Sequence, residues 1–298
     1  MELADERLID VVLGNGHMGS YCHWPRRTRT EAPGLAGLKS RLKRIWMAGD
    51  HDRLSRYLEP AAADFFKRLS VPRGSRLLDV GCGSGQFALI ASRNGIAATG
   101  IDIAENLVER ARERARIEQL DAQFRVADAE ALPFADSSFD FVTSLTGAMF
   151  APRPDVVAGE LLRVCRPGGT IAMTNWTAQG FIGKLLHQIS GFIAPPGMPD
   201  PALWGDESMV RERLGPGTRG VRIARGRVEF SFPFPPAEVV RFFREYHGPA
   251  NRAFASLNRA GRKVLQANLE ALWSEYNVAR DGLTRVDAEW LEVIAVRA

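Results

Sequence analysis

The sequence predicts an α/β fold in which a mostly parallel sheet carries helices on both faces. Short apolar runs alternate with helical patterns between residues 76 and 175, which is typical of consecutive βαβ units. A glycine-rich turn joins the first of these runs to a helix. Beyond Trp176 the alternation stops and mainly helical patterns follow. The C-terminal half is therefore expected to add a helical cap to the sheet.

The spacing of apolar residues places the individual elements. Before the alternating region, Leu38, Leu42 and Ile45 share one side of a short basic helix at 38–46, and a second helix at 61–69 ends before a Pro-Arg-Gly turn. Because crossovers between parallel strands are right-handed, the ligand crevice should lie at the carboxyl ends of the strands. Strands are expected at 76–80, 97–103, 123–127, 139–145 and 170–175, with helices between them at 86–93, 104–119 and 155–164.

The region after Trp176 is predicted in less regular order. A Gly/Pro-rich amphipathic stretch covers 181–197, and a helix follows at 207–214. A strand at 227–234 precedes two helices, at 236–246 and 251–276, and 289–296 is expected to be the last strand. The chain thus divides into a loosely ordered basic extension at 1–35 and one domain at 36–298, with a ligand-binding core at about 60–176, a cap at about 177–285 and the last strand.

The amino-acid composition limits the expected cellular location and the expected binding partners. The 298 residues are 45% hydrophobic and 25% charged, and no apolar run is long enough to cross a bilayer. Three widely separated cysteines support neither a disulfide framework nor a zinc site, so a cytoplasmic, metal-free protein is expected. The net charge of +4 originates in residues 21–44, where seven basic side chains face one acidic one. This basic segment is either a solvated lead-in or an arm for an anionic partner.

The glycine-rich turn contains Asp79 in the strand and glycines at 81, 83 and 85. Glycines allow a tight turn and let a ligand approach bare backbone. A dinucleotide-binding turn would follow the spacing G-x-G-x-x-G. In this chain the third glycine comes one residue early, and position 86 is Gln. The spacing therefore argues against a nicotinamide-type site.

Two further carboxylates follow predicted strands. Asp102 lies about twenty residues after the glycines, where a carboxylate can accept both hydroxyls of a ribose; it is also placed to cap the next helix. Asp128 at the end of the third strand can accept a hydrogen bond from an adenine amine, or it belongs to an ordinary polar loop. The segment Arg166-Pro167-Gly168-Gly169 is explained by a turn alone.

Taken in order, the pieces LDVGCGSG, GIDI, DAEALPF followed by SFD, and RPGG resemble the class I S-adenosylmethionine (SAM)-dependent methyltransferases, in the branch similar to ubiquinone and menaquinone methylases. The resemblance covers about 46–176. It implies a Rossmann-like sheet of seven strands whose last strand is antiparallel, and SAM as cofactor with S-adenosylhomocysteine as product.

The resemblance also implies roles for particular residues. Asp79 would orient the SAM ammonium, Gly81 and Gly83 would receive its amino-acid part, and Asp102 would bind the ribose. The remaining positions would contact adenine, the methyl side of the pocket or a lid; they are Ile103, Asp128 and Ala129 for adenine, Leu145 and Thr146 for the methyl side, and Trp46 and Asp50 for the lid.

The sequence argues against some classes of methyl acceptor. Position 144–147 reads Ser-Leu-Thr-Gly, unlike the motif that enzymes methylating nucleobase amines carry there. Cys82 is expected to line the cofactor pocket and Cys165 to be buried at a helix end, so neither is expected to attack cytosine. The acceptor pocket is expected from 176–204 and 242–254, with His187, Tyr246 and His247 as candidate bases.

Three hypotheses about function remain open. The first is methyl transfer by in-line displacement to a small, partly apolar acceptor. The second is a methyltransferase for RNA or protein that docks through the basic segment 21–44. The third is a SAM-fold module that binds ligand without catalysis.

Overall fold

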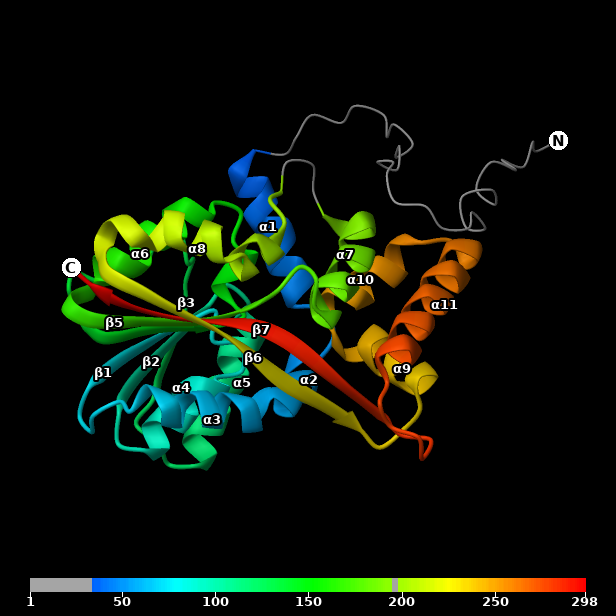
Figure 1. Cartoon of the computed structure of the whole chain (residues 1–298), viewed down its shortest axis with the longest axis horizontal. Helices are drawn as coiled ribbons and strands as arrows, with labels where there is room; N and C mark the ends of the chain where they lie inside the picture. Colours follow the sequence, from blue (N-terminus) through cyan, green and yellow to red (C-terminus); the bar gives the residue numbers. More distant parts are fainter. Residues whose placement is uncertain (1–33, 195–197) are drawn as a thin grey trace. The chain divides into compact units, whose positions relative to one another are not determined.

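The computed structural model describes residues 34–194 and 198–298. A seven-stranded sheet with the order β3-β2-β1-β4-β5-β7-β6 forms its centre (Figure 1). All neighbouring strands are parallel except the pairs that β7 makes with β5 and β6. The strands are β1 (Arg76–Val80), β2 (Ala97–Asp102), β3 (Gln123–Val126), β4 (Phe139–Leu145), β5 (Cys165–Trp176), β6 (Thr218–Phe232) and β7 (Thr284–Arg297). The predicted sheet with an antiparallel last strand is confirmed.

Helices cover both faces of the sheet. In Figure 1, α3 (Glu59–Leu69), α4 (Gln86–Arg93) and α5 (Glu105–Ile117) lie below the sheet, and α6 (Pro154–Val164) and α8 (Glu207–Leu214) lie above it. The helix-period spacing explains the packing. On α5, Leu107, Val108, Ala111 and Ala115 are buried while most of the other side chains face solvent. The two faces accordingly carry two separate hydrophobic cores.

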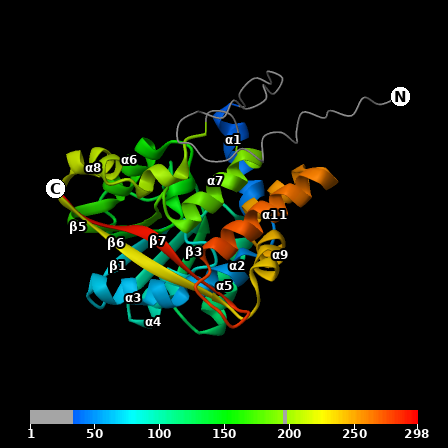
Figure 2. The same ribbon diagram turned by 45° about the vertical axis from the view of Figure 1, so that its right-hand side comes forward.

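A helical layer forms the predicted cap. It consists of α7 (Phe181–Ile193), α9 (Pro236–Tyr246), α10 (Gly248–Ser256) and α11 (Arg259–Tyr276), which pack on one another at one end of the sheet (Figures 1 and 2). Two N-terminal helices, α1 (Leu35–Trp46) and α2 (His51–Ser55), contact this layer through α10 and α9 respectively. The cap therefore supports the helices that precede the sheet.

The structure corrects several predicted boundaries. The predicted helix at 251–276 is two helices, because Asn258 begins α11 by accepting a hydrogen bond of 2.8 Å from the Gly261 N–H. The predicted strands at 227–234 and 289–296 are parts of a long hairpin, whose pairing runs from Thr218 opposite Arg297 to Phe232 opposite Thr284. Residues 177–285 are therefore not only a cap, since β6 is the edge strand of the sheet.

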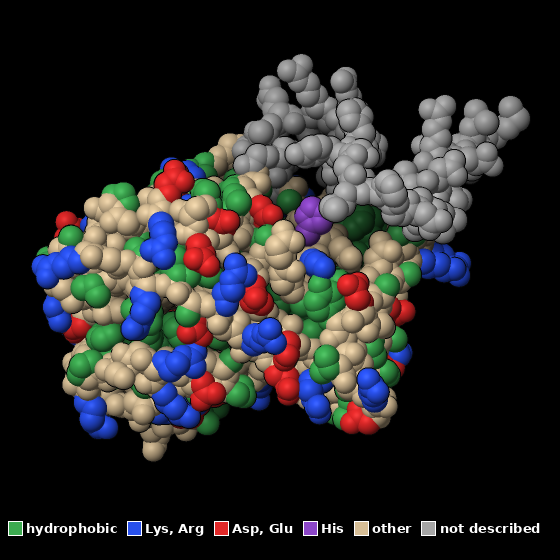
Figure 3. Space-filling model, viewed as in Figure 1, with side chains coloured by type: hydrophobic (Ala, Val, Ile, Leu, Met, Phe, Trp, Pro, Cys, Tyr) green, Lys and Arg blue, Asp and Glu red, His purple; other side chains and the backbone are tan. Residues whose placement is uncertain are grey.

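The N-terminal extension, the surface charge and the absence of membrane-spanning segments were also predicted from the sequence. The predicted extension at 1–35 falls outside the described residues apart from Gly34 and Leu35, and Leu35 already begins α1. On the face seen in Figure 3, Lys and Arg side chains alternate with Asp and Glu rather than forming one block. No helix within residues 34–194 and 198–298 is both long and apolar enough to cross a membrane.

Candidate active site

A pocket opens at the carboxyl ends of β1, β2 and β4, where the order of the strands reverses beside β1. This reversal is the place where open α/β sheets bind ligands. Helices α1 and α2 supply the opposite wall, through Lys39, Trp46 and His51 among others. All nine residues predicted to bind cofactor line the pocket: Trp46, Asp79, Gly81, Gly83, Asp102, Ile103, Asp128, Ala129 and Leu145. Thr146 lines it as well, whereas Asp50 does not.

The floor of the pocket is the glycine turn between β1 and α4. Gly81, Gly83 and Gly85 have φ values of 71°, 53° and 86°, a region that residues with a Cβ rarely adopt. A Cβ on Gly81 would lie 2.7 Å from the Cα of Gly147, in the loop after β4. A Cβ on Gly83 would meet nothing within 4 Å. The first glycine is thus required by packing, and the second leaves open space for a ligand.

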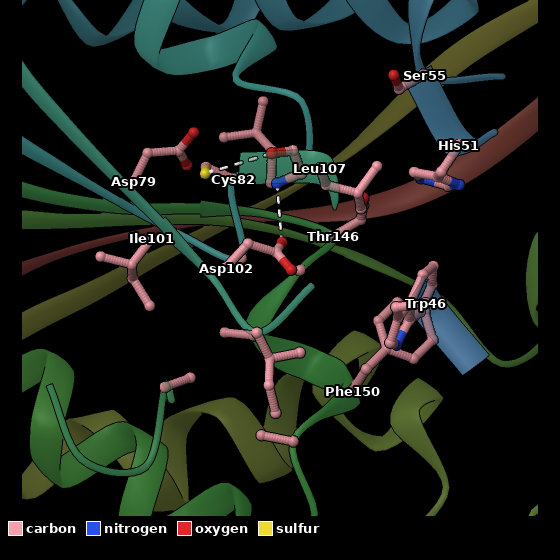
Figure 4. Close-up of a pocket in the computed structure, with 18 of the residues that line it drawn as sticks. Trp46, His51, Ser55, Asp79, Cys82, Ile101, Asp102, Leu107, Thr146 and Phe150 are labelled. Carbon is pink, nitrogen blue, oxygen red and sulfur yellow. Dashed lines mark hydrogen bonds between the residues drawn. The ribbon is translucent and has the colours of Figure 1, made fainter. Parts of the chain in front are cut away.

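Asp102 fixes the shape of this turn. Its Oδ2 accepts a hydrogen bond from the Gly83 N–H at 2.9 Å (Figure 4), and its Oδ1 accepts one from the Ala104 N–H at 2.8 Å. Burial raises the pKa of the Asp102 carboxyl, and the backbone hydrogen bonds partly oppose that effect. The N-cap of α5 is Ala104, and no side chain caps this helix, so the predicted capping role of Asp102 is wrong and its bond to the Ala104 N–H instead shapes the turn before α5.

Asp79 is a buried carboxyl without a basic partner among the described residues. Its side chain is 2% exposed, and the hydroxyl of Thr143 lies 3.5 Å from Oδ1. Burial, and secondarily the charge of Asp102, raises the pKa of Asp79 to about 7. A cation bound beside Asp79 would reverse this rise, so the pocket has a site prepared for positive charge.

Asp128 belongs to an ion-pair network that ties α1 to the pocket. Lys39 Nζ on α1 lies 2.5 Å from Asp128 Oδ2 and 2.6 Å from Glu130 Oε2. The buried Glu130 also pairs with Arg153 at 2.8 Å. The Asp128 and Glu130 carboxylates thus hold α1 over this side of the pocket.

Trp46, His51 and Phe150 form the opposite end of the pocket, away from Asp79 (Figure 4). The ring of Trp46 lies 5.4 Å from that of His51 and 4.8 Å from that of Phe150. Of these three residues, only Trp46 is predicted from the sequence. Neither His51 nor Phe150 belongs to a motif, and both reach the pocket because α2 and the turn after β4 each pack against Trp46 in the fold.

Comparisons with known proteins agree with this geometry. A family model described as a methyltransferase domain matches residues 78–173. An uncharacterized protein of Mycobacterium tuberculosis is 37% identical over 230 residues, covering 76% of this chain and 83% of that protein. Methyltransferase GfsG of Streptomyces halstedii is 37% identical over 132 residues, covering 43% of this chain and 48% of that protein.

Among solved structures, phosphoethanolamine N-methyltransferase 2 of Haemonchus contortus, in complex with SAM, matches with a TM-score of 0.53. It is 20% identical, and the match covers 80% of this chain and 52% of that one, so this likeness shows the fold. The chain belongs to the class I SAM-dependent methyltransferases. It is an enzyme of that family, as the order of its sequence motifs predicted.

The three bases predicted for this methyltransferase lie outside the pocket lining. His187 is exposed on α7, and the hydroxyl of Tyr246 accepts a hydrogen bond from Arg53 at 3.1 Å. His247 is buried behind His51, with 5.9 Å between the ring centres. The prediction placed the acceptor pocket in the cap, whose side chains do not line the pocket described here.

The cap itself does not line the pocket. Within the described residues, no lining side chain falls between Pro152 and Trp290. Phe181, Ile182 and Leu185 of α7 are buried in the hydrophobic core instead. An amphipathic pattern shows that one face of a helix is buried, but it does not show which part of the protein covers that face.

Neither buried cysteine of the methyltransferase is suited to nucleophilic attack. Cys82 lines the pocket, and burial raises the pKa of its thiol well above the usual value. Burial raises the pKa of Cys165 to about 11. Cys165 is the C-cap of α6 and the first residue of β5, so its predicted place, buried at a helix end, is confirmed. Since the thiolate is the attacking form, both remain unreactive thiols at neutral pH.

Proposed function

We propose that this methyltransferase binds SAM in the pocket described above and transfers the methyl group to a small, partly apolar acceptor. The observation that carries the proposal is the convergence of Asp79, Asp102 and Asp128 on one pocket whose far end is aromatic. When bound, SAM supplies an electrophilic methyl on a sulfonium. The protein then has to orient the acceptor behind the methyl and exclude water.

The residues present fit SAM. Asp79 would accept hydrogen bonds from the ammonium, which explains a buried carboxyl that lacks a basic neighbour among the described residues. Gly83 leaves the space for the amino-acid part, and Asp102 would bind the ribose hydroxyls. The adenine would lie beside Ile103 and Ala129, with its amine at Asp128.

The far end of the pocket supports an acceptor that is small and partly apolar. The side chains there are mainly apolar or aromatic: Leu42, Trp46, Phe150, Ala151 and Pro152. Asp79 and Asp102 lie away from these aromatic side chains (Figure 4), and the third acidic lining residue, Asp128, is paired with Lys39. An acceptor with an apolar ring fits this end better than a charged one.

Docking of RNA or protein through the basic segment finds less support. In the described part of that segment, Lys39 pairs with Asp128 and Glu130, and Lys43 pairs with Glu105 at 2.5 Å. These two lysines are engaged within the chain rather than offered to a partner. Residues 21–33 lie outside the described part.

The docking alternative can be tested on the exposed side of α1. We expect Arg41→Gln combined with Arg44→Gln to leave methyl transfer from labelled SAM to a cell-extract metabolite fraction unchanged, because neither arginine lines the pocket. Methylation of the RNA or protein fraction of that extract, abolished by the double substitution, would favour the docking alternative.

The cofactor assignment is tested by calorimetric titration of SAM into wild type and Asp102→Ala. We expect binding by wild type, weakened in the variant by about 2 kcal/mol, or roughly 30-fold, because the ribose loses its hydrogen bonds to a charged carboxylate. Far-ultraviolet circular dichroism controls for folding, because Asp102 also holds the Gly83 N–H. Lack of binding by wild type would refute the proposal. Binding without methyl transfer to any acceptor would favour the non-catalytic module.

A further inference from the structure

His51 lines the end of the pocket from which an acceptor would approach the methyl group of SAM bound as proposed above. Figure 4 places it, with Trp46 and Phe150, at the end of the pocket opposite Asp79, and Thr146 lies between the two ends. Of the three acidic lining residues, Asp79 and Asp102 lie away from this end and Asp128 is paired with Lys39, so these carboxylates are not offered to an ammonium group here. His51 is a lining residue there, and an imidazole that is uncharged at neutral pH has a ring nitrogen that can accept a proton from a bound acceptor.

The surroundings of His51 keep its imidazole neutral. Burial lowers its pKa to about 4, although the charges of Asp52 and Asp50 partly oppose the effect. Asp52 is itself paired with Arg56, Arg110 and Arg114, which reduces its influence. From the cap side, His51 faces His247, which is buried and whose pKa burial lowers to about 3. Both rings are therefore uncharged before the reaction.

The two imidazoles also share an unusual feature. The Nδ1 atoms of His51 and His247 are buried and have no hydrogen-bond partner among the described residues. A buried polar atom without a partner destabilises the fold. A structural role in packing would be filled equally well by Phe or Leu. Two adjacent imidazoles, of which His51 lines the pocket, are suited to proton chemistry instead.

We propose that His51 is the general base of this methyltransferase and that the acceptor is an aromatic hydroxyl compound held against Trp46 and Phe150. This inference rests on the proposed function, since it takes the donor methyl to lie between the glycine turn and His51. A neutral hydroxyl group on the acceptor needs no carboxylate partner. The aromatic ring of the acceptor would pack on the rings of Trp46 and Phe150.

The step balances within the pocket. The hydroxyl oxygen forms a bond to the methyl carbon, and the bond from that carbon to sulfur breaks with its electron pair left on sulfur. The hydroxyl proton moves to Nε2 of His51. A sulfonium and a neutral imidazole thereby become a thioether and an imidazolium, so the net charge of the pocket is unchanged. Loss of the sulfonium charge raises the pKa of His51 as the proton arrives.

The first test needs no acceptor. The chain has five histidines, and the ring signals of His51 in ¹⁵N-labelled full-length protein are assigned by their loss in His51→Gln. We expect the pKa of His51 to be lower with SAM bound than with S-adenosylhomocysteine bound, by about one unit or more, because only SAM carries the nearby positive charge. Equal pKa values in the two complexes would overturn the inference, whereas failure of SAM to bind would overturn the proposed function instead.

The second test measures transfer from labelled SAM to a panel of phenol, catechol and 1-naphthol. We expect wild type to methylate at least one of them, and His51→Gln and His51→Asn to lower kcat by about 100-fold or more while SAM affinity stays within a few-fold of wild type. His187→Gln, on the exposed face of α7, is the matched control and should behave as wild type. No transfer to any phenol overturns the acceptor assignment. Unchanged kcat in both His51 variants, or a change in KM alone, overturns the role as base.

Discussion

At pH 8, Asp79→Asn is expected to stabilise the ligand-free methyltransferase and at the same time to weaken SAM binding by about 100-fold or more. Both effects follow from one carboxyl that is 2% exposed and has no basic partner in the described part of the chain. A buried charge without a partner destabilises the fold. The same charge is the group that would hold the SAM ammonium through charge-assisted hydrogen bonds, each of which contributes about 1.5–3 kcal/mol.

The pKa of Asp79 determines the pH range of the stability effect. The pKa is about 7 in the folded protein against 3.8 for a free side chain. Between these values the unfolded chain has released the proton and the folded chain still holds it, so stability falls as pH rises from about 4 to 7 and stays low above 7. The difference of 3.2 units corresponds to at most about 4 kcal/mol. Asn removes this penalty.

The measurement is urea unfolding of wild type and Asp79→Asn at pH 4.5 and pH 8. We expect a gain of about 2–4 kcal/mol in the unfolding free energy at pH 8 and little difference at pH 4.5. Asp64→Asn, at an exposed position of α3, is the control and should change neither stability nor binding. A variant less stable than wild type at pH 8 would show that Asp79 is compensated in the ligand-free fold.

The raised pKa of Asp79 should also make the affinity of wild type for SAM depend on pH. The ammonium favours the charged form of Asp79, so below pH 7 binding has to release a proton and the affinity should fall about tenfold per pH unit. Titration calorimetry in buffers of different ionisation enthalpy measures that proton directly. In Asp79→Asn the affinity should be weak and independent of pH over the same range.

The site residues that could be predicted from sequence are those whose role depends on neighbours in the chain. Asp79, Gly81 and Gly83 occupy one strand and its turn, and Asp102 follows the next strand, so spacing alone brings them together at one edge of the sheet. The strand bounds of β1 and β4 and the helix bounds of α4, α8 and α9 agree with the prediction for the same reason. Local spacing determines local structure.

His51 and Phe150 could not be found in this way. The role of His51 depends on α2 lying against α9 and the pocket, which are contacts between segments far apart in sequence. The length of the β6–β7 hairpin was underestimated for the same reason. This length follows from the pairing of the two strands rather than from the composition of either strand. The boundary between α10 and α11, in contrast, could have been predicted from the sequence, because Asn258 is a preferred residue at a helix start.

Gly147→Ala is expected to unfold the floor of the pocket locally and to abolish SAM binding. Gly147 follows β4 and has φ −100°, which any residue can adopt, so the requirement for glycine is steric. Its Cβ would lie 2.8 Å from the Cα of Gly81 and would also meet the Gly81 carbonyl oxygen. Both obstacles are backbone, which cannot rotate away as a side chain could. The ends of β1 and β4 would have to separate.

We expect this substitution to lower the unfolding free energy by about 3 kcal/mol, the upper part of the range for overpacking a buried site. Two glycines of the same chain serve as controls. Gly159→Ala in α6 meets nothing within 4 Å and should raise stability by up to about 1 kcal/mol, since alanine favours helix. Gly83→Ala also meets no atom but has φ 53°. It should cost about 1–2 kcal/mol and still fold.

The comparison of Gly147→Ala with Gly83→Ala separates two ways of losing the cofactor. In Gly83→Ala the added methyl projects into space that the fold leaves open, so SAM binding should be lost in a protein whose unfolding transition stays cooperative. In Gly147→Ala binding should be lost together with stability, because the β1 and β4 ends no longer meet. If Gly83→Ala bound SAM as wild type does, the amino-acid part of SAM would not occupy the glycine turn. If Gly147→Ala kept full stability, the contact between the Gly81 and Gly147 backbones would not be what shapes the floor of the pocket.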